Sequence, residues 1–257
     1  MKTYVMIPTY NEKENIGNLI NEILNLKIKN LHIVVVDDNS PDGTWKIVQE
    51  ISKTHKNQRF LGHRKSKGFS SGKKNVHLLL RKTDRGRGSG GRDGFIYCLN
   101  HGADIIVEMD ADMSHDPKYI PLMIQELKNA DLVLGSRRVK GGKEIGRGLI
   151  RRIITYIANL YIQFLLGLKV KDCNSGYRCF KRKVLEGIRV EKLQSKGPSI
   201  VQEVLFKAHL KGFKIKEIPI TFINRKKGKS KLGIPQLVAG YFMVSKLRLL
   251  KLIGEIR

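Results

Sequence analysis

Three short apolar runs, each ending at polar residues, are the feature that most constrains how this chain can fold. Residues 4–7, 31–36 and 105–109 are rich in β-branched side chains and have the length of buried strands. Between the first two runs, residues 16–24 repeat apolar side chains at helical spacing. Alternation of such strands and helices predicts an α/β domain with a mainly parallel sheet. The carboxyl ends of its strands meet at one edge, where open α/β sheets bind ligands.

Asp110 and Asp112 directly follow the third run. Side chains at positions i and i+2 of an extended segment point to the same side, so both carboxylates face the predicted ligand edge. Mg²⁺ prefers oxygen ligands and usually shares them with phosphates, so the pair indicates a site for a divalent cation and a diphosphate. A solvated turn can carry the same two residues, and the D-x-D motif alone does not separate the two readings.

Polar residues also follow the other two runs. The first run leads into Pro8-Thr9-Tyr10-Asn11-Glu12, and the second leads into Asp37-Asp38-Asn39-Ser40 and a Pro-Asp-Gly turn. Three polar strand ends on one edge favour a shared ligand site over three separate solvated turns.

In order along the chain, these segments resemble the inverting glycosyltransferases of family 2, and most closely the dolichyl-phosphate (polyprenyl-phosphate) mannose synthases. The resemblance covers nearly the whole chain in the order of the family. Its further parts are Gly135-Ser136-Arg137, Gly141-Gly142, Arg151-Arg152-x-x-Thr155-x-x-Ala158-Asn159, Asp172-x-Asn174-Ser175-Gly176-Tyr177-Arg178, Glu203, and residues 218–232 with Arg225, Gly228 and Ser230-Lys231-Leu232.

The resemblance implies a GT-A type, Rossmann-like nucleotide-sugar-binding domain over residues 1–232, with amphipathic interfacial helices. Within it we expect a basic insertion loop at 54–75 and an amphipathic interfacial helix at 147–168. Residues 233–257 would form a basic amphipathic tail. The insertion carries seven basic residues and no acidic ones, which is typical of a solvated surface loop, although a contact with a membrane or RNA remains open. The glycine-rich segment 86–91 would allow the backbone to approach the nucleotide closely.

The resemblance also assigns site residues. Those expected to bind the nucleotide sugar are Pro8, Tyr10, Glu12, Val36, Asp38, Asp110, Ala111, Asp112, Arg137, Arg225 and Lys231. A cofactor, Mg²⁺ or Mn²⁺, would be held by Asp110, Asp112 and Ser114. Some relatives have Gln at the position of Ser114, so this contact is the weakest of the three. Glu203 matches a position near the active site and is given no proton-transfer role, and His115 is expected to lie in a second layer or at the surface.

Catalysis is expected to depend on Asp112, Arg137, Arg151 and Arg225, with Arg151 and Thr155 at an acceptor phosphate. Guanidinium groups suit bidentate phosphate recognition, and Arg151 and Arg225 are expected to serve the acceptor more than the donor. A phosphate oxygen is already anionic near neutral pH, so its attack on the anomeric carbon needs no strong general base. Positioning and charge stabilisation can then supply the catalysis.

The activity that the resemblance implies is transfer of mannose from GDP-mannose to dolichyl or polyprenyl monophosphate, giving a β-linked glycosyl phosphate lipid. A UDP-glucose or other UDP-sugar polyprenyl-phosphate glycosyltransferase is the alternative, because these motifs separate the donors poorly. A nucleic-acid-binding protein is a remote third reading, suggested by the formal charge of +26. It is disfavoured because the chain has no recognisable nucleic-acid-binding motif. A nucleotide sugar, a lipid phosphate and an anionic membrane surface account for the charge equally well.

A membrane location is suggested by residues 150–168. Their apolar side chains form one helical stripe, and Arg147, Arg151 and Arg152 cluster at its start. This pattern is typical of a helix lying in the headgroup plane, although a core helix on the sheet has the same periodicity. The uncharged stretch is short for a span, no signal peptide is visible, and the three cysteines have no metal-site spacing. We therefore expect a peripheral protein on the cytoplasmic face of a membrane, with room for a membrane-anchoring protein partner.

Overall fold

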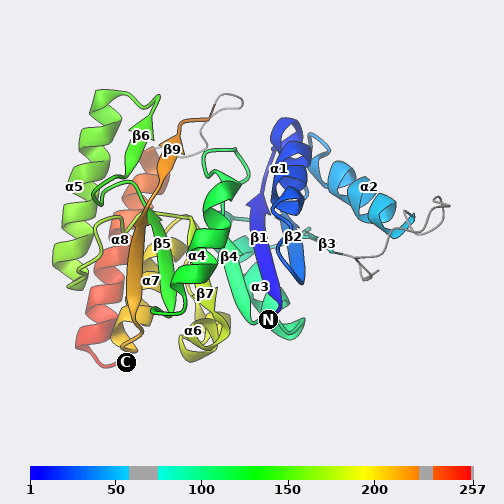
Figure 1. The fold of residues 1–257 in the computed structure, drawn as a ribbon. Coiled ribbons are helices and arrows are strands. Elements are labelled where there is room, and N and C mark those ends of the chain that lie inside the picture. Colours follow the sequence, from blue (N-terminus) through cyan, green and yellow to red (C-terminus); the bar gives the residue numbers. More distant parts are fainter. Residues whose placement is uncertain (58–74, 226–233, 256–257) are drawn as a thin grey trace.

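The computed structural model describes residues 1–57, 75–225 and 234–255 (Figure 1). A seven-stranded sheet forms its centre, in the order β3-β2-β1-β4-β7-β5-β8. Its strands are β1 Thr3–Thr9, β2 Leu31–Asp37, β3 Val76–Leu80, β4 Ile105–Glu108, β5 Leu132–Ser136, β7 Arg178–Lys181 and β8 Ile215–Pro219. Only β7 runs against its neighbours β4 and β5. The expectation of an α/β domain with a mainly parallel sheet is confirmed.

Helices cover both faces of the sheet, and a small second sheet stands beside it. The helices are α1 Lys13–Asn25, α2 Thr44–Asn57, α3 Arg87–Asn100, α4 Ile120–Glu126, α5 Leu149–Leu166, α6 Arg182–Gly187, α7 Ile200–Leu210 and α8 Ile234–Leu252. Two single 3-10 turns are η1 Pro117–Tyr119 and η2 Val190–Lys192. The second sheet pairs β6 Lys143–Ile145 with β9 Thr221–Ile223 in parallel.

Alternation of side chains along the strands produces two hydrophobic cores. Val5 and Ile7 of β1 point to the face that packs on α1, α2 and α4. Tyr4 and Met6 point to the opposite face, which packs on α3, α6, α7 and the inner sides of α5 and α8. Apolar burial on both faces is what a mostly parallel sheet requires, and it explains the nearly continuous apolar runs in the sequence.

Register aligns the polar strand ends. Thr9 at the end of β1 lies opposite Asp37 at the end of β2, and Met6 lies opposite Glu108 at the end of β4. The hydroxyl of Thr9 donates to the Asp37 carboxylate (3.0 Å), which links two of the strand ends. The three acidic segments predicted to meet at one edge of the sheet therefore do so.

The glycine-rich segment allows a close approach between two parts of the backbone. Gly86 and Gly88 pack against the backbone of residues 195–197, and a Cβ on Gly88 would lie 2.0 Å from the Ser195 carbonyl oxygen. The Gly88 amide donates to the Lys196 carbonyl (2.8 Å). At these two positions the close approach is thus between two segments of the protein, and it holds the start of α3 in place.

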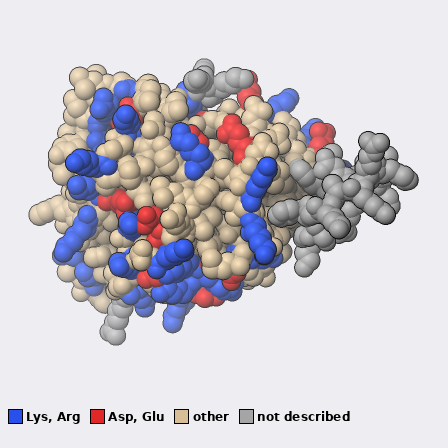
Figure 2. Space-filling view, in the orientation of Figure 1, with Lys and Arg blue, Asp and Glu red and all other residues tan. Residues whose placement is uncertain are grey.

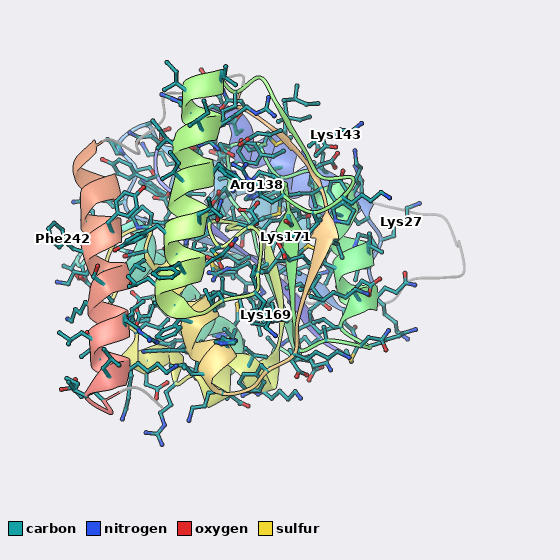
Figure 3. All side chains as sticks on the ribbon, turned by 90° about the vertical axis from the view of Figure 1, so that its left-hand side faces the viewer. Lys27, Arg138, Lys143, Lys169, Lys171 and Phe242 are labelled. Carbon is teal, nitrogen blue, oxygen red and sulfur yellow. The ribbon has the colours of Figure 1, made fainter. Side chains whose placement is uncertain are left out.

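Helices α5 and α8 lie side by side at one end of the molecule (Figures 1 and 3). The Tyr161 and Ser245 hydroxyls are hydrogen-bonded (2.8 Å), and the Tyr161 ring meets Tyr241 edge-on. Ile162 and Leu166 face the core, whereas Ile150 and Phe164 are 75% and 90% exposed. Most of the predicted apolar stripe therefore faces outward instead of packing on the sheet, whereas Leu168 is buried and Tyr161 and Leu165 are partly buried against the core. By length and composition alone, α5 could cross a membrane, and 22% of it is buried.

The predicted insertion at 54–75 lies mostly outside the described residues. Its first four residues continue α2, which ends at Asn57, and Asn75 directly precedes β3. Basic side chains are spread over the face of the molecule in Figure 2.

Candidate active site

The D-x-D motif lies immediately beyond β4, at the carboxyl edge of the sheet. Its loop makes a tight turn at Met113, whose φ of +62° is in the left-handed region that side chains other than glycine rarely adopt. The turn directs the Ser114 amide back to the Asp112 carboxylate (3.0 Å). Asp110 is more exposed than Asp112, with 39% and 8% of the side chains accessible. Strain at such a position indicates a loop shaped by its task.

Arg225 reaches this loop from the second sheet. Its guanidinium Nη2 lies 2.8 Å from Asp112 Oδ2, and the Ile223 amide donates to the Ser114 carbonyl (3.3 Å). The end of β9 is thereby fixed over the D-x-D turn. Arg225, expected to serve the acceptor more than the donor, is in direct contact with a predicted metal ligand.

A chain of charges runs beneath the motif. Glu108 is fully buried; its Oε2 accepts from Arg178, and its Oε1 accepts from Arg87 (2.8 Å). The same Arg87 Nη2 lies 3.4 Å from Asp110 Oδ1. Burial raises the pKa of Asp110, but the positive charges of Arg87 and Arg225 oppose burial and help to hold that pKa below its ordinary value. Asp110 is therefore ionised across the physiological pH range.

His115 is buried behind Asp110 and is not placed as a base. Its Nδ1 accepts from the Asp110 amide (3.1 Å), and its ring stacks on Tyr177 with 4.9 Å between centroids. Burial lowers the pKa of His115 and outweighs the attraction of Asp110 and Asp112. The ring is neutral and supports the motif from behind, in the second layer that the sequence suggested.

The nucleotide end of the predicted site is assembled from the ends of β1 and β2. Asp38 is ion-paired with Arg81, and its Oδ2 accepts from the Gly86 amide (2.7 Å). Burial raises the pKa of Asp38, against the lowering effect of these two partners. Tyr10 is exposed at the rim of a hollow of about 690 Å³, whose lining includes residues 39–43, Trp45 and Arg85.

The remaining residues predicted for this end have mixed exposure. The Glu12 side chain accepts from Asn15, and the Glu12 amide donates to Thr44. Pro8 is half-buried, while Val36 and Ala111 are buried. The ends of β1, β2 and β4 thus carry most of the residues predicted for the nucleotide sugar, while Arg137 follows β5 and Arg225 follows β9.

Arg137 is held in a bidentate pair. Its Nε and Nη2 donate to the two carboxylate oxygens of Asp172 (2.8 and 2.7 Å), and its Nη1 lies 3.7 Å from Glu144. These contacts tie the end of β5 to the 172–176 loop. Asn159 on α5 holds the same loop, since its Oδ1 accepts from the Cys173 amide (2.9 Å) and the Asn174 side chain (3.0 Å).

Arg151 and Thr155 lie one turn apart on α5. The Thr155 hydroxyl donates to the Arg151 carbonyl (2.8 Å). In the described part of the chain, no hydrogen bond or ion pair joins either residue to Asp110 or Asp112. Lys231 lies outside the described residues.

Glu203 has a structural environment. It is fully buried on α7 and accepts from the amides of Gln194 and Ser195, while Lys207 lies 2.9 Å away. Glu203 therefore fixes the segment against which Gly86 and Gly88 pack, and it holds no transferable proton near the motif.

The donor set fits a divalent cation that shares its coordination with a phosphate. Asp110 and Asp112 offer carboxylate oxygens, and the buried Ser114 hydroxyl has no hydrogen-bond partner among the described residues. An unpaired buried hydroxyl is uncommon, and it leaves the Ser114 oxygen available to a ligand. No group of three or more His, Cys, Asp or Glu side chains that could enclose a metal occurs in residues 1–57, 75–225 and 234–255. Two carboxylates completed by substrate oxygens are the usual arrangement for Mg²⁺.

Sequence reasoning gave no role to Arg87, Glu108 and Arg178, which hold the motif from below. A signal was present, because Glu108 precedes Asp110 by two residues on an apolar strand and a buried carboxylate requires a cation. The identity of that cation was not readable, since Arg178 lies 70 positions further along the chain.

We predict that His115 makes stability fall as the pH drops below about 6.5. Its folded-state pKa lies below the unfolded value, so the unfolded chain binds an additional proton in this range, and unfolding is favoured. Between about pH 7.5 and 5.5 the loss should be about 1 kcal/mol. Urea unfolding of wild type and His115→Asn at both pH values measures the difference, because Asn keeps an acceptor and does not titrate. The same pH dependence in both proteins would contradict this role.

Comparisons with known proteins agree with this geometry. Residues 4–189 match the family described as Glycosyl transferase family 2. Undecaprenyl-phosphate mannosyltransferase of Micrococcus luteus is 34% identical over 91% of this chain and 88% of its own length. Polyprenol monophosphomannose synthase of Mycolicibacterium smegmatis is 34% identical over 95% of the chain and 86% of its own length. Dolichol-phosphate mannosyltransferase of Pyrococcus furiosus is 36% identical over 90% of the chain but only 59% of its own length.

Solved structures are similar in fold. Glucosyl-3-phosphoglycerate synthase of Mycobacterium tuberculosis, in complex with Mn²⁺, UDP and glucosyl-3-phosphoglycerate, superposes with a TM-score of 0.64. The likeness covers 97% of this chain and 79% of that one at 16% identity, so it concerns the GT-A fold alone. The chain belongs to glycosyltransferase family 2, in which it is similar to the polyprenyl-phosphate and dolichol-phosphate mannosyltransferases.

Proposed function

We propose that this protein transfers mannose from GDP-mannose to a polyprenyl or dolichyl monophosphate, with inversion at the anomeric carbon. The observation that carries the proposal is the similarity to three mannosyltransferases of this kind over at least 90% of the chain. The D-x-D edge, with its arginines and unpaired serine hydroxyl, supplies the chemistry that such a transfer needs.

On the donor side, Asp110 and Asp112 would hold a divalent cation beside the diphosphate, with Ser114 as a further oxygen ligand. A bound Mg²⁺ or Mn²⁺ offsets the charge that develops on the leaving nucleoside diphosphate. Tyr10 offers a flat face to the base, and Glu12 and Asp38 accept hydrogen bonds from base or ribose. Arg225, already 2.8 Å from Asp112, binds the donor diphosphate or the incoming phosphate, with Lys231 as a second cation.

On the acceptor side, the nucleophile is an oxygen of the lipid phosphate. Arg151 and Thr155 receive this phosphate on α5, and Arg137 keeps the end of β5 and the 172–176 loop in place. No protein base is required, because the attacking oxygen is already anionic. This agrees with the position of His115, which is buried and neutral. Its Nδ1 already accepts a hydrogen bond from the Asp110 amide, so this nitrogen is not free to take a proton from a substrate.

The lipid reaches the site along an anionic membrane surface, to which the protein binds peripherally on the cytoplasmic face. The exposed apolar side of α5 supports this, as does Phe242, which projects outward from α8 (Figure 3). In the same view four basic residues lie on the side of α5 that faces away from α8: Lys143, Arg138, Lys171 and Lys169. An apolar helix face with a basic border is typical of proteins that lie in the headgroup region. A membrane-anchoring protein partner is compatible with this placement.

A donor screen tests the proposal. The purified protein is given labelled GDP-mannose, UDP-glucose or UDP-N-acetylglucosamine with polyprenyl phosphate and Mn²⁺, and label entering the organic phase is counted. We expect transfer from GDP-mannose alone, with β-linked product established by NMR. Transfer from UDP-glucose instead would identify the alternative glucosyltransferase, and no lipid-linked label from any donor would overturn the proposal.

Two variants should separate the donor from the acceptor half of the site. Asp112→Asn weakens the metal site, so transfer should fall at least about a hundredfold together with donor affinity. Arg151→Ala removes one charge-assisted phosphate contact, so transfer should fall about ten- to a hundredfold while donor affinity is unchanged. Calorimetry of GDP-mannose with Mn²⁺, beside transfer kinetics, measures both quantities.

Matched controls for these variants are Asp131→Asn, at the opposite edge of the sheet, and Lys246→Ala on exposed α8 surface. Both should keep near wild-type transfer. A loss of donor affinity in Arg151→Ala as large as its loss of transfer would place this arginine at the diphosphate instead.

Membrane attachment should depend on the outer face of α5. Phe164→Ser removes a ring that is 90% exposed, and roughly tenfold weaker binding to anionic liposomes is expected from the lost apolar burial. Leu122→Ser, at an exposed apolar residue on α4, is the control and should bind as wild type. Wild type should be released partly by high salt and fully by alkaline carbonate. Retention in carbonate would show that α5 spans the bilayer.

A further inference from the structure

Arg87 lies directly beneath the D-x-D motif, as the first residue of α3. Its Nη2 reaches both Glu108 (2.8 Å) and Asp110 (3.4 Å). Two glycines leave room for the guanidinium: a Cβ on Gly91 would be 3.2 Å from Nη1, and one on Gly176 would be 3.7 Å from Nη2. Arg87 is thereby seated between two backbone segments, with its charge against a predicted metal ligand.

The charges around the motif balance without a metal. The three carboxylates are Glu108, Asp110 and Asp112, and the three guanidiniums paired with them are Arg87, Arg178 and Arg225. His115 adds no charge, because its Nδ1 accepts the Asp110 amide hydrogen. Arg137, the next cation outward, is matched by Asp172.

A balanced set of this kind is a poor receptor for a free divalent cation. The cation would have to displace or face Arg87 and Arg225, and its two charges would then have no counter-charge in a partly desolvated site. A nucleoside diphosphate brings at least two negative charges. The metal and the diphosphate together therefore restore the balance that either one alone disturbs.

We propose that Arg87 is a positioning residue that acts as an internal counter-ion of Asp110, so that the metal and the nucleoside diphosphate bind as a pair. The inference rests on the proposed function only in taking the D-x-D as a metal and diphosphate site. Loss of the Arg87 charge leaves Glu108 paired with Arg178 and removes the guanidinium that lies 3.4 Å from Asp110. The site would then attract a cation in the absence of nucleotide.

Mn²⁺ binding, followed by the EPR signal of the free ion, tests the pairing without any turnover. For wild type we expect weak binding of Mn²⁺ alone and binding about 5- to 150-fold tighter with saturating GDP. Calorimetry must then give the same factor for GDP with and without Mn²⁺, because the coupling is reciprocal. Equal Mn²⁺ affinity with and without nucleotide would overturn the proposal.

Variants assign the effect to Arg87. Arg87→Gln should bind Mn²⁺ alone about tenfold more tightly than wild type and lose most of the coupling, whereas Arg87→Lys, which keeps the charge, should retain it. Arg92→Gln is the matched control, since Arg92 is on the same helix but pairs with Asp84 and Asp93. Unchanged or weaker binding of Mn²⁺ alone to folded Arg87→Gln would refute the counter-ion role. If Arg87→Gln fails to fold, the test uses the coupling between Mn²⁺ and GDP in wild type and in Arg87→Lys. Absence of this coupling in either protein would refute the counter-ion role.

A UDP arm separates this inference from the proposed function. If Mn²⁺ binding is coupled to UDP but not to GDP, the counter-ion role of Arg87 stands and the base of the donor is uracil instead of guanine. Coupling with GDP in a protein that transfers no mannose to lipid would uphold the counter-ion while overturning the activity.

Discussion

The pairing of Glu108 with two arginines is the interaction on which the site depends. Glu108 and Arg178 are both fully buried, and removing Glu108 would leave the charge of Arg178 uncompensated inside the protein, which typically costs about 3–5 kcal/mol. The ion pair with Arg178 alone would compensate the buried charge of Glu108. Arg87 makes a second contact to the same carboxylate, and the same nitrogen of its guanidinium also contacts Asp110. Arg87 therefore links the buried ion pair of the core to the D-x-D motif.

Sheet register determines where that network can act. β4 is central, with β1 on one side and the antiparallel β7 on the other, so Glu108 faces Arg178 across the β4–β7 pair. The antiparallel strand brings Arg178 in from a distant part of the chain and places Gly176 beside Asp110. A parallel strand at this position would present its other end to the motif. The single reversal in the sheet therefore has a direct consequence for the site.

The fold was predictable from the sequence because it depends on local patterns. The runs over 4–7, 31–36 and 105–109 became β1, β2 and β4 within one or two residues at each end, and the aspartates fell at their carboxyl edge. What the sequence could not give was pairing between distant residues. Nothing near Asp112 indicates that Arg225 will contact it, and nothing near Arg137 indicates that Asp172 will occupy both arms of its guanidinium. The glycines at 86 and 88 were expected to allow a close approach to the nucleotide. Their contact with the backbone of residues 195–197 could not be read from the sequence, because that segment lies more than a hundred residues away.

The second sheet connects the two halves of the proposed reaction. β6 leads into α5, the helix with the exposed apolar face, and its partner β9 leads into Arg225 at the D-x-D. Glu144 of β6 is ion-paired with Arg147 (2.5 Å) and with Arg137 (3.7 Å). These two pairs link the segment that precedes α5 to the end of β5. Asn159 makes a second tie from the inner side of α5 to the 172–176 loop. In the proposed reaction the lipid phosphate stays at the membrane surface, so its attack would require α5 and the donor site to be held in one rigid arrangement. These contacts supply that arrangement, which is why we assign the polar inner side of α5 to positioning and its apolar outer side to the membrane.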